Sequence, residues 1–285
     1  MVALVTPFRN GKVDEKALER LVELHIKNGT TALVPCGTTG ESATLSYDEH
    51  DRVIELTVQF AKGRVPVIAG TGSNSTEEAI ALTKHAKKAG AAASLQVSPY
   101  YNKPTQKGLY LHFKAIAEAV DIPIIIYNIA SRTGVNIEPE TFVKLAAIKN
   151  IIGVKESSGN LEQMSRIRSL CPKEFLLISG DDALTLPVLS IGGVGIISVV
   201  ANIIPRDVAD MCIAFEKGDM KKAQSLHYKM LPLVKAVFIE TNPIPVKTAM
   251  GLMKLIDPDL RLPMCEMLPE NREKLIEEMK KYKLI

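Results

Sequence analysis

Ile151 to Lys155 reads IIGVK, and the polar stretch ESSG follows it directly. A short, branched apolar run of this kind is typical of a buried β-strand, and Lys155 falls where that strand would surface. Burial disfavours the charged form of an ammonium, so this lysine could act as an amine nucleophile toward a carbonyl. On the pentapeptide alone, a lysine that extends to solvent is the simpler interpretation. The rest of the chain decides between the two.

Seven further apolar runs have a similar length, and most of them precede a polar or glycine-bearing turn and then a helical pattern. They span residues 3–6, 32–36, 65–69, 93–97, 123–127, 175–179 and 194–199. Their starts lie roughly 20 to 33 residues apart, which is the length of one strand, one helix and two loops. Eight such units predict an α/β fold, a (β/α)8 TIM barrel. We prefer the barrel to an open doubly wound sheet, which the period alone does not exclude.

Polar caps and glycines predict where the helices begin and end. Asp14 suits the N-cap of a first helix, and Ser75 with Glu78 has the spacing of a capping box. Gly29 and Gly90 suit helix C-termini just before the next strand. We therefore expect the helices of the barrel to be marked by their own local signals.

The last part of the chain is helical in pattern throughout. Its four expected segments, separated by prolines, are residues 207–217, 219–240, 244–254 and 269–282. We therefore predict two parts: a (β/α)8 barrel over residues 1–205, and a C-terminal helical region over residues 206–285 that packs on the barrel.

Composition excludes several classes of protein. A chain of 285 residues can bury one large core, and 46% apolar with 24% charged residues is ordinary globular usage. The formal charge of +3 comes from basic residues spread along the chain without a dense block. Nucleic acid is therefore not an expected partner.

The four cysteines, Cys36, Cys171, Cys212 and Cys265, are far apart and form no CxxC pair. There are also no paired histidines at metal spacing, so we expect reduced thiols and no metal site. Met1 leads directly into a strand-like segment, and no apolar stretch reaches the length of a membrane span. The expected location is the cytoplasm, without membrane contact.

Polar residues close the predicted strands, at the end of a barrel where active sites lie. They read GTTGES at 37–42, SPYYN at 98–102, YN at 127–128, KE at 155–156 and GDD at 180–182. Hydroxyls, glycines and one amine would therefore meet at one end of the barrel. Imine chemistry needs such a set: a neutral amine, a proton relay, and donors that hold the acid group of a substrate.

Individual residues suit these roles, each with a simpler alternative. Tyr127, one unit before Lys155, suits the relay hydroxyl, or it could pack on a loop. Thr38 and Thr39 could present hydroxyls and N–H groups to a carboxylate, or form a plain turn with a helix cap. Arg132 could bind a second carboxylate in bidentate fashion, or it could be solvated.

Six blocks of sequence match a known family in the right order along nearly the whole chain. They are GTTGESATL at 37–45, VIAGTGSN at 67–74, SPYYNKP at 98–104, YNIASRTG at 127–134, IIGVKE at 151–156 and NPIPVK at 242–247. The chain thus resembles the dihydrodipicolinate synthase, or 4-hydroxy-tetrahydrodipicolinate synthase, family. The resemblance implies a (β/α)8 barrel with a C-terminal helical appendage, no cofactor or metal, and a homotetramer built as a dimer of dimers. It also leaves room for a start upstream of Met1, since relatives carry extra sequence before the first strand.

The implied activity is that of a class I carbon–carbon lyase. It condenses pyruvate, held as a Schiff base, with L-aspartate 4-semialdehyde in lysine and diaminopimelate biosynthesis. By the matching motifs, Lys155 forms the imine, Tyr127 relays protons, and Thr39 links Tyr127 to Tyr101, which in this family reaches in from the dimer partner. The implied substrate-binding positions are Thr38 and Thr39 for the pyruvate carboxylate, Arg132 for the semialdehyde carboxylate, and Gly180 and Ile197 through their backbones.

Sibling enzymes share the lysine and the GTTGE block: N-acetylneuraminate lyase, keto-deoxy sugar acid aldolases and hydroxyproline-pathway lyases. They commonly differ in the loop after Tyr127, so SRTG at 131–134 favours the synthase. Ala130 departs from the proline usual in the family and bears on the loop that carries Arg132. An alternative of a different class is a catalytically silent, ligand-binding barrel. Retention of the whole catalytic set argues against it.

Many family members are inhibited by lysine bound in a cleft at the dimer interface. The positions that match this cleft are Ser42, Ala43, His50, Asn74, Glu78 and Tyr100. Glu78 suits the lysine amines, although Glu78 and His50 could instead lie on a solvated helix face. Tyr47 stands where lysine-sensitive bacterial members often have histidine. We therefore expect weak or absent inhibition.

Overall fold

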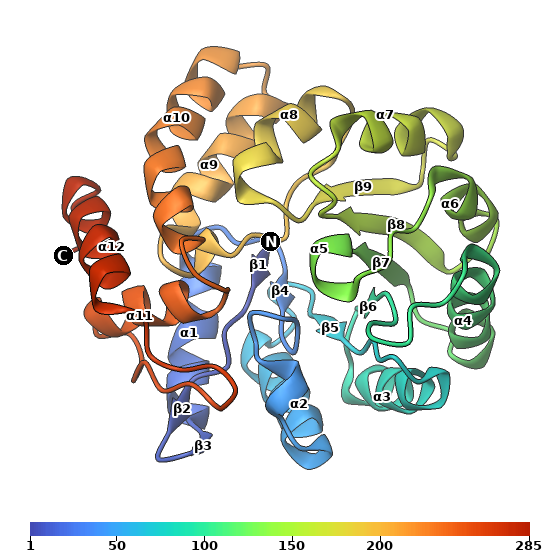
Figure 1. Cartoon of the computed structure of the whole chain (residues 1–285), viewed down its shortest axis with the longest axis horizontal. Coiled ribbons are helices and arrows are strands. Elements are labelled where there is room, and N and C mark those ends of the chain that lie inside the picture. Colours follow the sequence, from blue (N-terminus) through green and yellow to red (C-terminus); the bar gives the residue numbers. More distant parts are fainter. The chain divides into compact units, whose positions relative to one another are not determined.

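The computed structural model describes all 285 residues, which form two compact units (Figure 1). The first unit comprises residues 1–65 and 198–285, and the second comprises residues 66–197. Each unit has its own strands and helices. The residues proposed for catalysis are divided between the two units.

The second unit is a parallel sheet covered by helices. Its five strands are hydrogen-bonded in sequence order: β5 (Ile68–Gly70), β6 (Ala93–Val97), β7 (Ile124–Asn128), β8 (Ile151–Glu156) and β9 (Leu176–Ser179). The connecting helices are α3 (Thr76–Ala89), α4 (Gln106–Ala119), the short α5 (Ala130–Thr133), α6 (Pro139–Ala146), α7 (Leu161–Leu170) and α8 (Thr185–Ser190), with a 3₁₀ turn η2 (Asp182–Leu184). Figure 1 shows α3, α4, α6 and α7 side by side along the strands, as βα units require.

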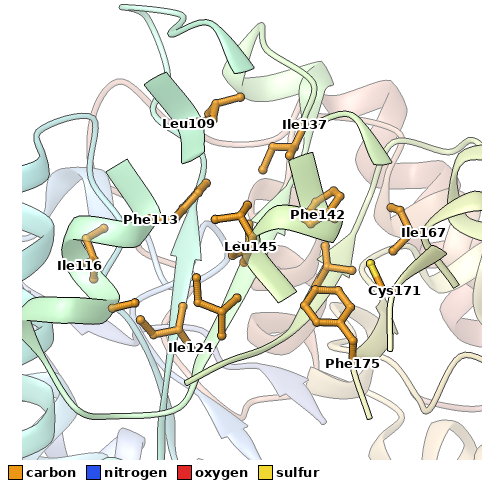
Figure 2. Close-up of a cluster of buried hydrophobic side chains, with 14 of the residues drawn as sticks. Leu109, Phe113, Ile116, Ile124, Ile137, Phe142, Leu145, Ile167, Cys171 and Phe175 are labelled. Atoms are coloured by element: carbon orange, nitrogen blue, oxygen red, sulfur yellow. The ribbon is translucent and has the colours of Figure 1, made fainter. Parts of the chain in front are cut away.

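A buried hydrophobic cluster holds these helices against the sheet (Figure 2). Phe113 of α4 and Phe142 of α6 are fully buried, and the ring of Phe142 lies 6.3 Å from that of Phe175. Each large apolar side chain buried in this way contributes roughly 1.5–3 kcal/mol. The helices thereby fix the strands that end in the predicted site residues.

The first unit is built mainly from helices. Its strands are β1 (Val2–Ala3), parallel to β4 (Leu33–Val34), and the antiparallel pair β2 (Phe8–Arg9) and β3 (Lys12–Val13). Its helices are α1 (Glu15–Lys27), η1 (Ser42–Thr44), α2 (Tyr47–Ala61), η3 (Val200–Asn202), α9 (Pro205–Glu216), α10 (Met220–Val237), α11 (Ile244–Leu252) and α12 (Pro269–Lys281). Helix α10 packs against α9 and α12, and α1 packs against α2.

Most of the predicted helix ends are confirmed. The Asp14 side chain accepts a hydrogen bond from the Ala17 amide at 2.9 Å, and Gly90 ends α3 with a φ of 95°. Ser75 accepts from the Glu78 amide as predicted, but the Glu78 carboxylate accepts from the Ser73 hydroxyl at 2.6 Å. A capping box with both bonds occurs at the start of α2 instead, between Ser46 and Glu49.

Two local features differ from the sequence-based expectation. Residues 194–199 form no regular strand: Ile196 makes an isolated parallel bridge to Ser179, and Ser198 makes one to Val2. Gly195, with a φ of 152°, and the 3₁₀ turn that follows leave no room for a longer ladder. The β2–β3 hairpin was not predicted, although its Asn-Gly turn at residues 10–11 is a strong hairpin signal.

Helices α9 to α12 coincide closely with the four helical segments expected after residue 205. The boundary between a barrel and a C-terminal region at that residue stays a prediction. None of the helices combines the length and the apolar composition that a bilayer crossing requires.

Candidate active site

Lys155 lies near the end of β8, directly beside Tyr127 of β7. The two residues are paired in the parallel ladder, and the lysine Nζ lies 4.0 Å from the centroid of the tyrosine ring. Lys155 is only 5% exposed, so the interpretation of a lysine that extends to solvent is wrong. The Lys155 amine therefore lies over the face of the Tyr127 ring.

Glu156 and Asn128, the next residues on the same two strands, join the strand ends through their side chains. The Asn128 amide donates to the Glu156 carboxylate at 2.9 Å, and the backbone N–H of Ser158 donates to it at 2.7 Å. Burial raises the pKa of Glu156, while these hydrogen bonds act in the opposite direction. Sequence reasoning gave Glu156 no role, although its place directly after Lys155 was a signal.

Gly180 packs directly on the side chain of Lys155. A Cβ at Gly180 would lie 2.9 Å from Lys155 Cε and 1.9 Å from the hydroxyl oxygen of Ser157, so only glycine fits without displacing them. The Gly180 amide donates to the Glu156 carbonyl, and the Ile197 amide donates to the Ser179 carbonyl. Because both amides are already bonded, the backbone of Gly180 or Ile197 could contact a substrate only through its carbonyl oxygen.

Thr38 and Thr39 lie in the first unit, in a tight turn after β4. Within this turn the Gly40 amide donates to the Gly37 carbonyl and the Glu41 amide to the Thr38 carbonyl, each at 3.1 Å. Thr39 is 2% exposed, and its hydroxyl oxygen accepts from the side-chain amide of Asn242 at 3.0 Å. The Thr39 hydroxyl is therefore buried and bound by a distant side chain, while its role toward a carboxylate stays a prediction.

A buried ion pair anchors the same turn. Lys247 and Glu41 are almost completely buried, with 2.6 Å between Nζ and the carboxylate, and Lys247 also donates to the Thr6 carbonyl. Burial lowers the pKa of Lys247, while the charge of Glu41 opposes that shift. Sequence reasoning gave neither residue of this pair a role, although Lys247 ends the NPIPVK block and Glu41 belongs to GTTGES.

Tyr101 and Arg132 are at the surface of the second unit. Tyr101 is 90% exposed and has a φ of 67°, which is rare for a bulky residue. Arg132 belongs to the single helical turn α5, which begins at Ala130 and is closed by Gly134 in a left-handed conformation. A Cβ at Gly134 would lie 2.7 Å from the Lys103 side chain, so this turn packs closely on the loop that follows Tyr101.

The six positions matched to a lysine-binding cleft are divided between the units: Ser42, Ala43 and His50 lie in the first, and Asn74, Glu78 and Tyr100 in the second. His50 is 6% exposed, so the alternative of a solvated helix face is wrong for it. The Asn74 carbonyl accepts from Asn102, and Glu78 is partly buried against Ser73.

The structure thus brings together Lys155, Tyr127 and Gly180 within one unit. Thr38 and Thr39 are positioned within the other unit, and their convergence with Lys155 stays a prediction. A primary amine such as that of Lys155 is the group that can form an imine with a carbonyl substrate.

Comparisons with known proteins extend over the whole chain. The sequence model of the Dihydrodipicolinate synthetase family matches residues 1–282. The 4-hydroxy-tetrahydrodipicolinate synthase of Syntrophus aciditrophicus is 60% identical over 100% of this chain and 98% of that protein.

Solved structures agree with this match. The dihydrodipicolinate synthase from Aquifex aeolicus has a TM-score of 0.98 and 53% identity, covering 99% of this chain and 97% of that chain. The chloride-inhibited enzyme from Acinetobacter baumannii, complexed with pyruvate, has a TM-score of 0.97 and 46% identity, covering 100% and 98%. The fold is therefore the predicted (β/α)8 barrel with C-terminal helices, and the chain belongs to the dihydrodipicolinate synthetase family.

Proposed function

We propose that this protein condenses pyruvate with L-aspartate 4-semialdehyde to give 4-hydroxy-tetrahydrodipicolinate, a step of lysine and diaminopimelate biosynthesis. The observation that carries the proposal is the buried Lys155 amine, 4.0 Å from the Tyr127 ring at the end of a parallel strand pair. Relatives over the full length of the chain bear the name of this activity, and one of them is solved with pyruvate. The cytoplasm is the proposed location.

The proposed chemistry uses the Lys155 amine as the nucleophile and a proton relay. The Lys155 nitrogen adds to the C2 carbonyl of pyruvate, and the hydroxyl of the adduct leaves as water to give an imine. Loss of a proton from C3 gives an enamine, whose carbon attacks the aldehyde of the second substrate. The amino group of that substrate then displaces Lys155 from C2, which closes the ring and restores the free amine.

Tyr127 is the proposed acid and base in these proton transfers, with Thr39 linking it to the Tyr101 of a second copy. The exposure of Tyr101 supports a partner that covers it. Its left-handed backbone, which costs roughly 1–3 kcal/mol, supports a functional placement. We therefore propose a dimer as the catalytic unit, and a dimer of dimers as the complete homotetramer.

The substrate carboxylates are assigned to residues of the two units. Thr38 and Thr39 would bind the carboxylate of pyruvate, and Arg132 that of the semialdehyde. Gly180 and Ile197 would line the site through their carbonyl oxygens. Because Arg132 contacts only the second substrate, Arg132→Ala is expected to impair use of the semialdehyde far more than imine formation with pyruvate.

Inhibition by lysine is expected to be weak or absent. Tyr47, at the start of α2, stands in place of the histidine common in sensitive relatives and is 59% exposed. The proposed cleft would use Ser42, Ala43, His50, Asn74, Glu78 and Tyr100. Titration of the enzyme with lysine tests this, and half-maximal inhibition at a submillimolar concentration would refute it.

The test of the proposed function is pyruvate consumption by the purified protein, with aspartate semialdehyde or N-acetylmannosamine as the second substrate. Turnover confined to the semialdehyde supports the synthase. Turnover with the sugar would keep Lys155 as the nucleophile but assign the enzyme to the sialic acid lyase branch. No turnover with any aldehyde would favour a silent, ligand-binding barrel.

A further inference from the structure

The segment that carries Arg132 leaves the end of β7 and returns to the same point. It comprises residues 129–136, here called the Arg132 loop, and contains no proline, so its backbone alone does not fix one conformation. Asn128, the last residue of β7, closes the loop with its side chain. The Asn128 side-chain carbonyl accepts from the Ile137 amide at 3.0 Å, and its side-chain N–H donates to Asn136 Oδ1 at 2.8 Å.

Contacts inside the Arg132 loop join its residues into one unit. The buried Thr133 hydroxyl lies 2.9 Å from the Val135 carbonyl oxygen. The Gly134 amide donates to the Ala130 carbonyl at 2.9 Å and ends the helical turn α5. A shift at the point where the loop is anchored would therefore move the backbone of Arg132.

That anchor is a ring of four polar groups around the carboxylate of Glu156. Asn128 Nδ2, which donates to Asn136, also donates to Glu156 Oε2 at 2.9 Å. From α7, Gln163 Nε2 donates to the same two oxygens, at 3.1 Å to Asn136 and 3.3 Å to Glu156. Asn136 Nδ2 donates in return to Gln163 Oε1 at 2.8 Å. Because Glu156 is completely buried and follows Lys155 on β8, the loop is attached to the strand of the proposed nucleophile.

Helix α4 holds the end of the Arg132 loop from another direction. The side-chain N–H of Gln106 donates to the Asn136 backbone carbonyl at 2.8 Å. Its side-chain carbonyl accepts from the Glu138 amide at 3.1 Å and from the Thr141 hydroxyl at 2.7 Å. Asn136 is thus bonded to β7 and α7 through its side chain and to α4 through its backbone.

We propose that Asn136 is a positioning residue that directs Arg132, and that it thereby makes the site selective for an aldehyde that carries a carboxylate. The inference rests on the proposed function, in which Arg132 binds the carboxylate of the semialdehyde. A guanidinium binds a carboxylate through two parallel N–H bonds, so its direction matters. Since the strand ladder sets Lys155 and Tyr127, loss of Asn136 affects the second substrate and spares the first.

The test is the variant Asn136→Ala, assayed for two steps separately. Its kcat/KM for aspartate semialdehyde is expected to fall about tenfold, because a small displacement of a substrate-binding group is costly. The rate of pyruvate capture, measured by borohydride trapping and mass spectrometry, is expected to change less than about twofold. An unchanged kcat/KM, or equal losses in the two steps, would overturn the proposal.

A double variant shows whether Asn136 acts through Arg132. When Arg132→Ala has already removed the guanidinium, adding Asn136→Ala is expected to lower kcat/KM by less than about twofold more. Losses that multiply fully in the double variant would contradict the proposal, because they would mean that Asn136 supports the site by another route.

Asn150→Ala is the matched control for a lost asparagine contact. Asn150 is half-buried like Asn136 and directly precedes β8, at the opposite end of that strand from Lys155. Its side-chain N–H lies within hydrogen-bond distance of the carbonyl oxygens of Ala117, Val120 and Ile122. The control should unfold at a lower urea concentration but keep its kcat/KM for the semialdehyde. A loss of kcat/KM equal to that of Asn136→Ala would assign both effects to general destabilisation and overturn the proposal.

Gln106→Leu keeps the test decisive if Asn136→Ala does not fold. Gln106 lies on α4, away from the strand ends, and holds the backbone of Asn136. Its replacement is expected to lower kcat/KM for the semialdehyde about threefold while pyruvate capture is unchanged. Equal losses in the two steps, or no loss in either, would refute the proposal.

The same assays separate this inference from the proposed function. A wild type that does not use the semialdehyde refutes the proposed function, and this inference with it. A wild type that uses the semialdehyde, with kcat/KM about 100-fold lower in Arg132→Ala but unchanged in Asn136→Ala, refutes this inference alone.

Discussion

The two regions that carry the proposed catalytic groups are built by different means. Tyr127 and Lys155 lie on neighbouring parallel strands, and backbone hydrogen bonds of the ladder set their register. Thr39 lies in a turn without a ladder, and side chains from distant parts of the sequence, Asn242 and Lys247, hold that turn in place. The positions of Tyr127 and Lys155 are therefore set by backbone hydrogen bonds, whereas the position of the turn depends on a few individual side chains.

Lys155→Ala is the substitution with the largest expected effect, because the ladder places the amine but cannot replace it. Covalent capture of pyruvate should be abolished, since the nucleophile itself is lost. Mass spectrometry after borohydride reduction measures the adduct. Lys144→Ala, on the surface of α6, is the matched control and should retain full capture. A pyruvate adduct that persists in Lys155→Ala would refute the assignment of this residue.

Lys247→Met tests how far the turn depends on one side chain. It leaves the Glu41 carboxylate buried without its countercharge, which is expected to lower the free energy of unfolding by about 3–5 kcal/mol. Lys281→Met breaks a pair of the same length, 2.6 Å, on the exposed face of α12, and solvent already screens that pair. Urea denaturation of both variants measures the difference. Similar losses in the two variants would show that burial of the Lys247 pair is not what stabilises the turn.

Gly180→Ala tests the region of the parallel strands, where Gly180 packs against the side chain of Lys155. The new Cβ would approach Lys155 Cε to 2.9 Å and the Ser157 hydroxyl to 1.9 Å, so both side chains must move. A shift of the nucleophile on this scale costs about 100-fold in kcat. Activity assays on Gly180→Ala and on the double variant Gly180→Ala/Ser157→Ala check the cause. Full recovery in the double variant would mean that Ser157, and not the displaced Lys155, accounts for the loss.

The same comparison explains what the sequence could predict. The strands from residue 93 to residue 179 were predicted almost to the residue, because apolar runs and turn residues are local signals. The pairing of Tyr127 with Lys155 then follows from one βα period. Strands of the first unit are only two residues long, so their expected extents were too great.

The contacts of the turn could not be predicted from local patterns. Asn242 lies 203 residues from Thr39 and Lys247 lies 206 residues from Glu41, and no periodicity links positions so far apart. The likeness of the NPIPVK block to the family marked the segment but gave it no role. The close approach of Gly180 to Lys155 was equally invisible, because it depends on the distance between two neighbouring strands.

Glu156→Gln is the substitution with the smallest expected effect on activity. The ladder would still hold Tyr127 and Lys155 in register after the carboxylate is removed, so kcat should fall less than about tenfold, well short of the loss expected in Gly180→Ala. A loss as large as that expected in Gly180→Ala would mean that side chains, and not the backbone, position the strand ends. Glu140→Gln, an exposed carboxylate on α6, is the matched control and should keep full activity.

The pH dependence of the unfolding free energy provides a second measurement on Glu156→Gln. Because burial raises the pKa of Glu156 above its ordinary value of 4.5, its contribution to stability is fully present below that pH. The contribution is lost as the pH rises through the folded-state pKa, by about 1.4 kcal/mol for each unit by which the pKa is raised. Glutamine does not titrate, so the difference in unfolding free energy between wild type and Glu156→Gln should change in favour of the variant between about pH 4 and pH 7. If the difference in unfolding free energy does not vary with pH, the pKa of Glu156 is the same in the folded and unfolded states. The hydrogen bonds from Asn128 and Ser158 would then fully offset the effect of burial on that pKa.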